Sequence, residues 1–451
     1  MSVTRTLAAF AVETKTESLP PEVSARALAL ATDLIGSIIR AANESDSTPS
    51  VLKMLARLGL DAPGECTVFG LSRRYAPAAA ALLNGTFGHS LDFDDTHSDS
   101  SLHPSAPVVP AALAAAEMTG ASGTDFLAAV VVGFEVCCRL GNALDPTSHY
   151  ARGFHPTATA GNFGATAAAG RLLGLSVDQM CSAFGVVASQ ASGSLQFLVN
   201  GAWNKRYQVG EASMKGLIAA TLALEGFHGS ADAIDGKHGF LKGYSDGADP
   251  AKAVANLREI WETMNIGVKP YPACRYTHAA VDGLLALKRD HGLTVADIEN
   301  ITVGLHRNGI TLVGAPLAEK RRARSVVEGQ FSMPFAAAVA LTRDRFGWDD
   351  YDLLGRLEID ELADKVDVIR DESLEGLRHP FGATLKVRAK GQVYDLRIAD
   401  PSGEPETFPT PEASIEKFRA LAGPCLNART EPFLASLSAL GRAESLKGYF
   451  G

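Results

Sequence analysis

The stretch ATAGNFGATAAAGRLLGL, residues 158–175, decides the fold class of the larger part of this chain. Its small and apolar residues recur at helical spacing, and it lacks the alternation that marks a half-buried strand. Gly161 and Gly164 each weaken a helix by about 1 kcal/mol relative to alanine, so their presence indicates that another helix approaches closely. The same composition occurs in PAALAAAEMTG, residues 110–120. We therefore predict an all-helical region over residues 1–265.

Residues 266–404 have a different pattern. Apolar residues alternate with other types in ITVGL, residues 301–305, and in two runs within residues 385–398 that a Gly-Gln turn separates. The alternation predicts strands, and the turn predicts a hairpin. Residues 405–451 return to leucines at helical spacing. We therefore predict a mainly α protein with an α+β second domain: residues 1–265 and 405–451 form one large helical domain, and residues 266–404 form the smaller α+β domain.

Composition and charge limit the function classes. The chain has 451 residues, 46% of them hydrophobic and 21% charged, which is typical of a globular protein with two or three domains. Its 42 basic residues against 51 acidic residues give a net charge of −9, so nothing indicates a nucleic-acid partner. An acidic protein that binds anions has to gather its positive charge locally.

The sequence predicts a cytoplasmic protein that does not enter a membrane. Its six cysteines form no C-x-x-C pair, which favours reduced thiols. The apolar part of the N-terminus is short and is interrupted by Glu13, unlike a secretory signal. The best membrane candidate, FLAAVVVGF at residues 126–134, is well short of the ~20 residues that a membrane span needs, so we expect a core helix.

The candidate chemistry lies in scattered polar residues, because the sequence has no P-loop, zinc-protease, esterase or dinucleotide-binding motif. Five of the 11 histidines lie close together in the chain: His89, His97, His103, His149 and His155. Three of these belong to GHSLDFDDTHSDSSLHPSAP, residues 88–107, which also holds several aspartates. The segment fits a site for Mn, Fe or Zn, an acid/base site in which an aspartate orients a histidine, or helix capping with solvated charge.

Basic residues in other glycine- or proline-containing segments favour the acid/base interpretation. The segments are RGFHPTATAG with His155, NGAWNKRYQVG with Lys205, and VKPYPACRYTH with Lys269 and Arg275. One such lysine or arginine is usually a solvated surface group, but several in irregular segments indicate a shared site. Tyr150 is a weaker candidate acid.

Five motifs, in this order and spacing, resemble the MmgE/PrpD family: GHSLDFDDTH, HPSAPVVPAALA, GFHPTATAG, NKRYQVGEASMKG and KPYPACRYTHAAVD. The family includes 2-methylcitrate dehydratase, cis-aconitate decarboxylase and iminodisuccinate epimerase. The resemblance implies a helical domain built from both ends of the chain, a smaller α+β lid domain, a homodimer, and catalysis without a metal or organic cofactor.

The resemblance also implies a set of site residues. The expected catalytic residues are His103, His155, Lys205 and Asp92, and the expected substrate-binding residues are Thr96, Lys269 and Arg275. Either histidine, or Lys205 if its pKa is lowered, could be the base. The sequence departs from the family pattern at Phe335, where cis-aconitate decarboxylases have a tyrosine, because a phenyl ring cannot transfer a proton.

These residues predict an enzyme that removes a proton next to a carboxylate of a small di- or tricarboxylate. We expect a lyase similar to 2-methylcitrate dehydratase, with an epimerase of an amino-dicarboxylate such as iminodisuccinate as the alternative. A cis-aconitate decarboxylase is less favoured because of Phe335, and a non-catalytic, carboxylate-binding dimer is a further possibility. The sequence does not decide which residue is the acid and which is the base.

Overall fold

The computed structural model describes residues 1–376 and 380–450 and divides the chain into two compact units. We call Met1–Gly267 with Thr410–Gly451 the helical unit, and Val268–Pro409 the mixed unit. The mainly helical fold class with a second α+β unit is confirmed.

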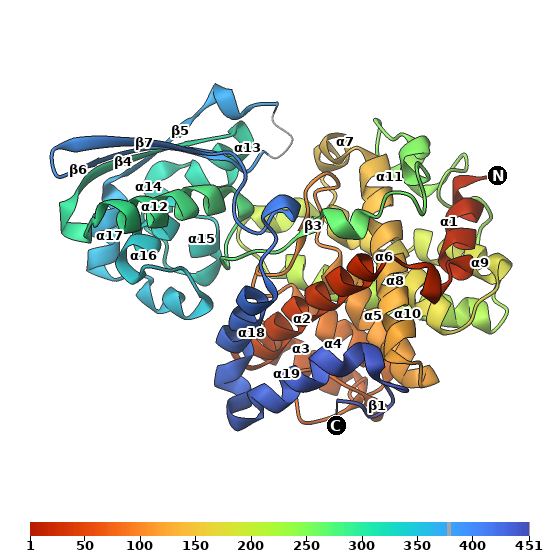
Figure 1. The fold of residues 1–451 in the computed structure, drawn as a ribbon. Helices are drawn as coiled ribbons and strands as arrows, with labels where there is room; N and C mark the ends of the chain where they lie inside the picture. The colour runs from red at the N-terminus through yellow and green to blue at the C-terminus, as the bar shows by residue number, and fades with distance from the viewer. Residues whose placement is uncertain (377–379, 451) are drawn as a thin grey trace. The chain divides into compact units, whose positions relative to one another are not determined.

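Helices make up most of the helical unit (Figure 1). They are α1 (Val3–Glu13), α2 (Pro21–Glu44), α3 (Thr48–Leu58), α4 (Pro77–Gly88), α5 (Ser105–Thr119), α6 (Gly123–Leu144), α7 (Pro146–Ala151), α8 (Pro156–Leu172), α9 (Val177–Ala188), α10 (Asn204–Leu224), α11 (Phe240–Tyr244), α18 (Pro411–Leu426) and α19 (Thr430–Ala439). Ser176 and Gln179 form the capping box that begins α9.

Helices α6 and α8 approach closely where both carry glycine. A Cβ on Gly164 would lie 2.7 Å from both the Cβ of Cys137 and the backbone oxygen of Gly133. A Cβ on Gly133 would in turn lie 2.9 Å from the oxygen of Gly164. The glycines that weaken α8 locally therefore allow the close packing that the sequence predicts.

The apolar run at residues 126–134 lies inside α6. Within the described residues, α6 alone has the length and hydropathy of a membrane span, and 94% of its most apolar window is buried inside the protein. Its charged residues Glu135 and Arg139 are also buried, and they pair with each other at 3.1 Å. The helix is accordingly a core helix of the helical unit.

The expectation of an all-helical first domain is wrong in detail. Residues Pro63–Cys66 form the short strand β1, and β2 (Thr96–His97) pairs antiparallel with β3 (Ile266–Gly267). The loop between α4 and α5 is buried, so its backbone polar groups need partners that no helix supplies there. A two-residue ladder meets this need, and it leaves little trace in the sequence pattern.

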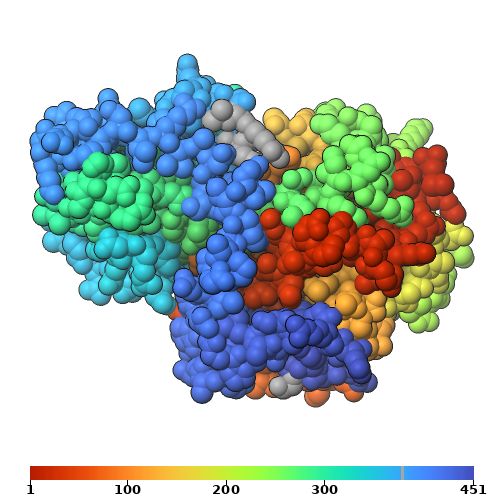
Figure 2. Space-filling model, in the orientation of Figure 1, coloured from red at the N-terminus to blue at the C-terminus, as the bar shows by residue number. Residues whose placement is uncertain are grey.

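The C-terminal helix α18 completes the helical unit by packing on α2. In Figure 2 the dark blue C-terminal residues lie against the red N-terminal helices. Lys417 of α18 lies 2.7 Å from Asp33 of α2, and its Nζ lies 4.1 Å from the ring centre of Phe93. The two ends of the chain thus share one core.

The mixed unit contains a four-stranded sheet of order β5–β4–β6–β7. The strands are β4 (Ile298–Leu305), β5 (Val366–Arg370), β6 (Ala383–Ala389) and β7 (Gln392–Ile398). Strands β4 and β5 run parallel, and the other neighbours run antiparallel. The hairpin predicted within residues 385–398 is β6–β7, and its turn contains Gly391 at φ +69°.

Helices of the mixed unit pack beside this sheet (Figure 1). They are α12 (His278–His291), α13 (Arg307–Gly309), α14 (Leu317–Lys320), α15 (Val326–Gln330), α16 (Met333–Arg343) and α17 (Leu357–Asp364). Gly283 of α12 faces Leu385 of β6, and the predicted C-cap Gly292 ends α12 in the left-handed conformation.

Candidate active site

Four helix ends of the helical unit meet at one polar cluster. His89 caps the C-terminus of α4, His103 lies just before α5, His155 is the N-cap of α8, and Lys205 lies in the first turn of α10. A proline follows each of the last two histidines, and it suits a helix start because its missing N–H is not needed there. Three helix N-termini, each with a partial positive charge, therefore face the same place.

The imidazole of His89 lies close to two other imidazoles, those of His103 and His155. The ring centre of His89 lies 5.0 Å from that of His103 and 5.8 Å from that of His155. The side chains of His89 and His155 are buried, and that of His103 is half-buried. The structure thus brings together two predicted catalytic histidines that are 52 positions apart in the sequence, together with a third histidine.

The hydrogen bond of His103 decides which of its nitrogens is basic. Its Nδ1 lies 2.6 Å from the backbone oxygen of Asp95, which can only accept a hydrogen bond. Nδ1 therefore carries a proton, and in the neutral ring the lone pair lies on Nε2. The backbone N–H of His103 donates to Thr157 Oγ1 at 3.1 Å, which fixes the residue further.

His155 has the opposite arrangement. The side-chain amide of Gln208, in its assigned orientation, donates to His155 Nδ1 at 2.7 Å. Nδ1 therefore holds the lone pair, and Nε2 carries the proton. Burial, and then the nearby His89 and Lys205, hold the pKa of His155 well below its usual value of 6.5. The ring is consequently neutral at physiological pH and presents an N–H donor.

Lys205 of α10 forms an ion pair with Asp92. The Asp92 side chain is 7% exposed, and its backbone has the left-handed φ of +53°. Few residue types tolerate this conformation, and aspartate is one of them. The pair keeps a cationic ammonium group beside the imidazoles.

The loop between α4 and α5 holds further buried polar groups. Asp95 accepts hydrogen bonds from the backbone N–H and the hydroxyl of Ser105, at 3.2 and 2.5 Å, and so caps α5. Burial, and then the neighbouring Asp94 carboxylate, raise the pKa of Asp95 well above its usual value. Thr96 Oγ1 is buried and has no hydrogen-bond partner in the described parts of the chain.

The arrangement does not resemble a metal centre. No group of three or more His, Cys, Asp or Glu side chains within residues 1–376 and 380–450 is placed to hold a metal ion. A base, an N–H donor and an ammonium group around one point instead suit proton transfer.

Comparison with known proteins identifies the family. The model described as "MmgE/PrpD N-terminal domain" matches residues 5–253, and the model described as "MmgE/PrpD C-terminal domain" matches residues 271–436. This chain belongs to the MmgE/PrpD family. It is 30% identical over 452 residues to a cis-aconitate decarboxylase-like protein of Aspergillus oryzae, which covers 93% of this chain and 90% of the relative.

Other MmgE/PrpD relatives have similar names. A cis-aconitate decarboxylase of Aspergillus terreus is 30% identical over 444 residues, covering 93% of this chain and 89% of that protein. The human cis-aconitate decarboxylase is 32% identical over 222 residues, covering 48% of this chain and 45% of that protein.

Two neighbours of the predicted residues were not among the expected site residues of this MmgE/PrpD chain. The Nδ1 atom of His89 forms a hydrogen bond with Asp94 Oδ2 at 2.7 Å. Its Nε2 atom is buried and has no partner in the described residues. Burial, together with Lys205, lowers the pKa of His89 although Asp94 opposes this. Gln208 lies three residues after Lys205, on the same face of α10. This helical spacing from Lys205 is the feature of the sequence that could have indicated Gln208 as a site residue.

Two other clustered histidines have structural contacts instead. His97 bonds to Ser100 at 2.7 Å and to Glu262 at 3.0 Å, and His149 bonds to the backbone oxygen of Tyr244 at 2.9 Å. Tyr150, the weaker candidate acid, is 38% exposed. Only part of the sequence cluster therefore reaches the candidate active site.

Lys269 and Arg275 belong to the mixed unit. Lys269 is buried, at 2% exposure. The guanidinium group of Arg275 lies 2.8 and 2.7 Å from Glu404 through its Nε and Nη2 atoms. The expected carboxylate clamp thus already has an internal carboxylate partner, and substrate binding by Arg275 stays a prediction. Phe335 is also buried here, with its ring stacked on Tyr351.

Proposed function

We propose that this protein is a lyase that transfers a proton at the carbon next to a carboxylate of a small di- or tricarboxylate. The observation that carries the proposal is the pair of imidazoles with opposite tautomers: His103 offers a basic Nε2 and His155 offers an Nε2–H. A base and a donor of this kind are what enolate formation requires.

His103 is the proposed base. Its Nε2 accepts the proton from the carbon, and the C–H electron pair moves toward the adjacent carboxylate to form an enolate. The Nδ1–H bond to the Asp95 carbonyl stabilises the imidazolium that results. This assignment needs no tuning of a lysine pKa, because an ordinary imidazole titrates near neutrality.

His155 and Lys205 are the proposed electrophilic groups. The neutral His155 donates a hydrogen bond to the oxygen on which negative charge develops. Lys205, which is ion-paired with Asp92, adds a positive charge nearby. Donors that are already in place stabilise the developing charge without further reorganisation. The electron pair of the enolate then forms the carbon–carbon double bond as the C–O bond breaks, and the ammonium group of Lys205 protonates the hydroxyl, which departs as water.

Free hydrogen-bonding capacity supports a ligand at this place. His89 Nε2 and Thr96 Oγ1 are buried without partners in the described residues. Buried polar atoms are usually satisfied, so such exceptions call for a ligand or water. The three helix N-termini favour an anion, which explains how a protein of net charge −9 can attract a polycarboxylate.

The 2-methylcitrate dehydratase type of reaction is our first choice, because the site holds both a base and an acid for a departing hydroxyl. Decarboxylation is the second candidate, and the names of the relatives favour it. In that reaction the C–C bond to carbon dioxide breaks, and the carbanion takes a proton from His103 in its protonated form. Phe335 supports the first choice, because it supplies no proton.

Turnover in deuterated water tests the proposal. Wild-type enzyme is incubated with 2-methylcitrate, cis-aconitate and amino-dicarboxylates, and products are read by mass, ultraviolet absorbance and chirality. Loss of water indicates the dehydratase, release of carbon dioxide with one deuterium indicates the decarboxylase, and inversion indicates the epimerase. No turnover and no deuterium exchange on the whole panel would contradict the lyase proposal and favour a carboxylate-binding protein.

A matched pair of variants tests the base. His103→Gln is expected to lower the rate by about 10²–10⁴-fold, the usual contribution of a general base. His228→Gln is the control, because His228 is exposed and lies outside the site. Equal rates in the two variants would remove His103 from the base role while leaving the family assignment intact.

We also propose the homodimer that the family resemblance implies. Large apolar side chains are exposed next to the first turn of α10: Val199 is 75% exposed, Leu198 46% and Trp203 41%. Exposed apolar residues in one segment support a protein interface. Sedimentation of the purified protein tests this, and a monomer at micromolar concentration would contradict it.

A further inference from the structure

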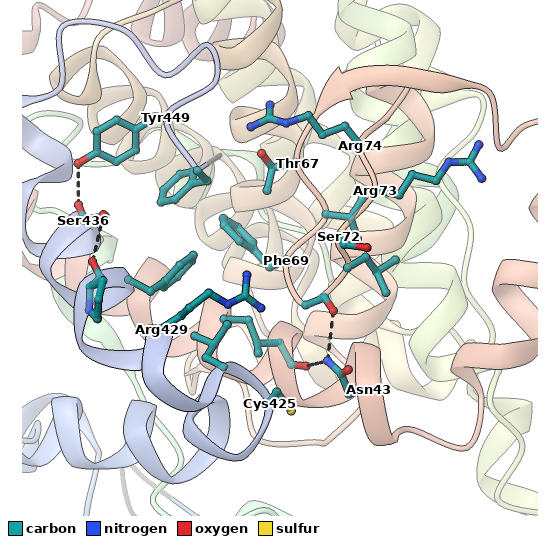
Figure 3. Close-up of a pocket in the computed structure, with 18 residues that line it drawn as sticks. Asn43, Thr67, Phe69, Ser72, Arg73, Arg74, Cys425, Arg429, Ser436 and Tyr449 are labelled. Carbon is teal, nitrogen blue, oxygen red and sulfur yellow. Dashed lines mark hydrogen bonds between the residues drawn. The ribbon is translucent and has the colours of Figure 1, made fainter.

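A cavity of the helical unit differs in chemical character from the histidine cluster. It has a volume of about 540 Å³ and lies between the loop at residues 67–74, the C-terminal ends of α2 and α18, helix α19 and the chain segment at Tyr449 and Phe450. Figure 3 shows this cavity. It shares no lining residue with the histidine cluster, and its volume is within the range of small-molecule sites.

Arginines supply the charge of this cavity. Its lining includes Arg73, Arg74 and Arg429 and no aspartate or glutamate. In Figure 3 the Arg74 and Arg429 side chains extend into the cavity, whereas Arg73 points away from it. Arg73 contacts Asp61 at 3.3 Å, and Arg74 donates to the backbone oxygen of Glu65 at 2.7 Å and lies 3.8 Å from the Glu117 carboxylate. Arg429 has no carboxylate partner in the part of the chain that the structure describes. In a protein of net charge −9, this is a local excess of positive charge.

Aromatic rings supply the apolar wall. Phe69 lies edge-to-face with Phe433 and Phe450, at ring-centre distances of 5.9 and 5.1 Å. The backbone N–H of Phe69 donates to Asn84 of α4 at 3.0 Å, so the loop is anchored to the helical core. Tyr449 donates to the backbone oxygen of Ser436 at 2.7 Å, which holds the opposite wall (Figure 3).

We propose that this cavity is a binding site for a small organic anion with a flat apolar body, such as an aryl phosphate or aryl carboxylate. Arg429 and Arg74 pair with the anionic group, and Phe69 and Phe433 contact the ring. A ligand with charge alone leaves the aromatic wall uncovered, and an uncharged ring leaves Arg429 without an anionic partner. The site is independent of the proposed lyase reaction.

Calorimetry with phenyl phosphate tests the site on the full-length protein. We expect saturable binding with one ligand per chain, weakened about tenfold or more by Arg429→Met, because a charge-assisted hydrogen bond is lost. Arg73→Met is the matched control, since that side chain points away, and it is expected to change the affinity less than twofold. Both arginines are exposed, so neither variant threatens the fold.

Four results would overturn the proposal. Absence of saturable binding removes the site, and equal weakening by the two variants shows non-specific attraction to surface charge. Inorganic phosphate binding as tightly as phenyl phosphate removes the role of the aromatic wall. Lys205→Met distinguishes the arginine-lined cavity from the histidine cluster. Binding of phenyl phosphate that persists in this variant supports the arginine-lined cavity. Binding that disappears assigns the probe to the histidine cluster.

Discussion

Gln208→Glu changes the electrostatic environment of His155 at a single atom. The wild-type amide donates to His155 Nδ1 at 2.7 Å and keeps the proton on Nε2. A carboxylate at the same place accepts a hydrogen bond instead, so Nδ1 gains a proton. Above the raised pKa of His155 the ring is neutral with its lone pair on Nε2, so the proposed donor becomes an acceptor; below that pKa the ring is a cation and keeps its Nε2–H. We expect turnover to fall although no group that contacts substrate has been removed.

The size of the effect follows from the separation of the charges. At about 4 Å between charge centres and an effective dielectric constant of about 20, the attraction between carboxylate and imidazolium is about 4 kcal/mol. The carboxylate therefore raises the pKa of His155 relative to the wild type. In the wild type the folded pKa lies below the unfolded value near 6.5, so the unfolded chain binds the proton first. Stability therefore falls as the pH drops below about 6.5, and Gln208→Glu is expected to reduce this loss.

Nuclear magnetic resonance of protein labelled with ¹⁵N-histidine measures the change directly. The His155 signals are assigned with His155→Gln, and Nδ1 is expected to move from the pyridine-type to the pyrrole-type position in Gln208→Glu. Gln179→Glu is the control: Gln179 is a half-buried capping-box residue of α9, and glutamate fits the same role. An unchanged Nδ1 signal with an unchanged pH profile would refute the tautomer assignment.

Three further predictions concern packing, a buried acid and metal dependence. Gly164→Ala should lower the free energy of unfolding by about 1–3 kcal/mol through overpacking, whereas Gly243→Ala, with nothing within 4 Å of the new Cβ, should not; equal melting temperatures would contradict this. Burial alone would raise the pKa of Glu262, but the hydrogen bond from His97 lowers it to about 2. Glu262→Gln should therefore lower the free energy of unfolding at pH 7 by up to about 3 kcal/mol, and this loss should shrink as the pH falls from 4.5 toward 2. A loss of the same size at every pH, measured by urea unfolding, would count against this prediction. Chelators should leave turnover unchanged, and activity restored by a divalent ion would revive the metal interpretation.

Several residues of the candidate site could be predicted from the sequence. His103, His155, Lys205 and Asp92 were expected from their motifs, and the structure brings them together at the ends of α5, α8 and α10 and in the loop before α5. The proton-donor and proton-acceptor roles of the two histidines could not be predicted from the sequence. The partner of His155 is 53 residues away, and nothing in the spacing of the two motifs predicts a hydrogen bond between them.

The sequence by itself determined the fold class, the β6–β7 hairpin and the helix ends at Ser176 and Gly292. These features depend on neighbours three or four positions apart in a helix or two positions apart in a strand, so the local pattern contains them. Tertiary structure alone decided that His89 joins the cluster, that Arg275 is paired with Glu404, and which nitrogen of each imidazole holds the proton. The position of a proton depends on the group that lies opposite each nitrogen, and packing between distant segments selects that group.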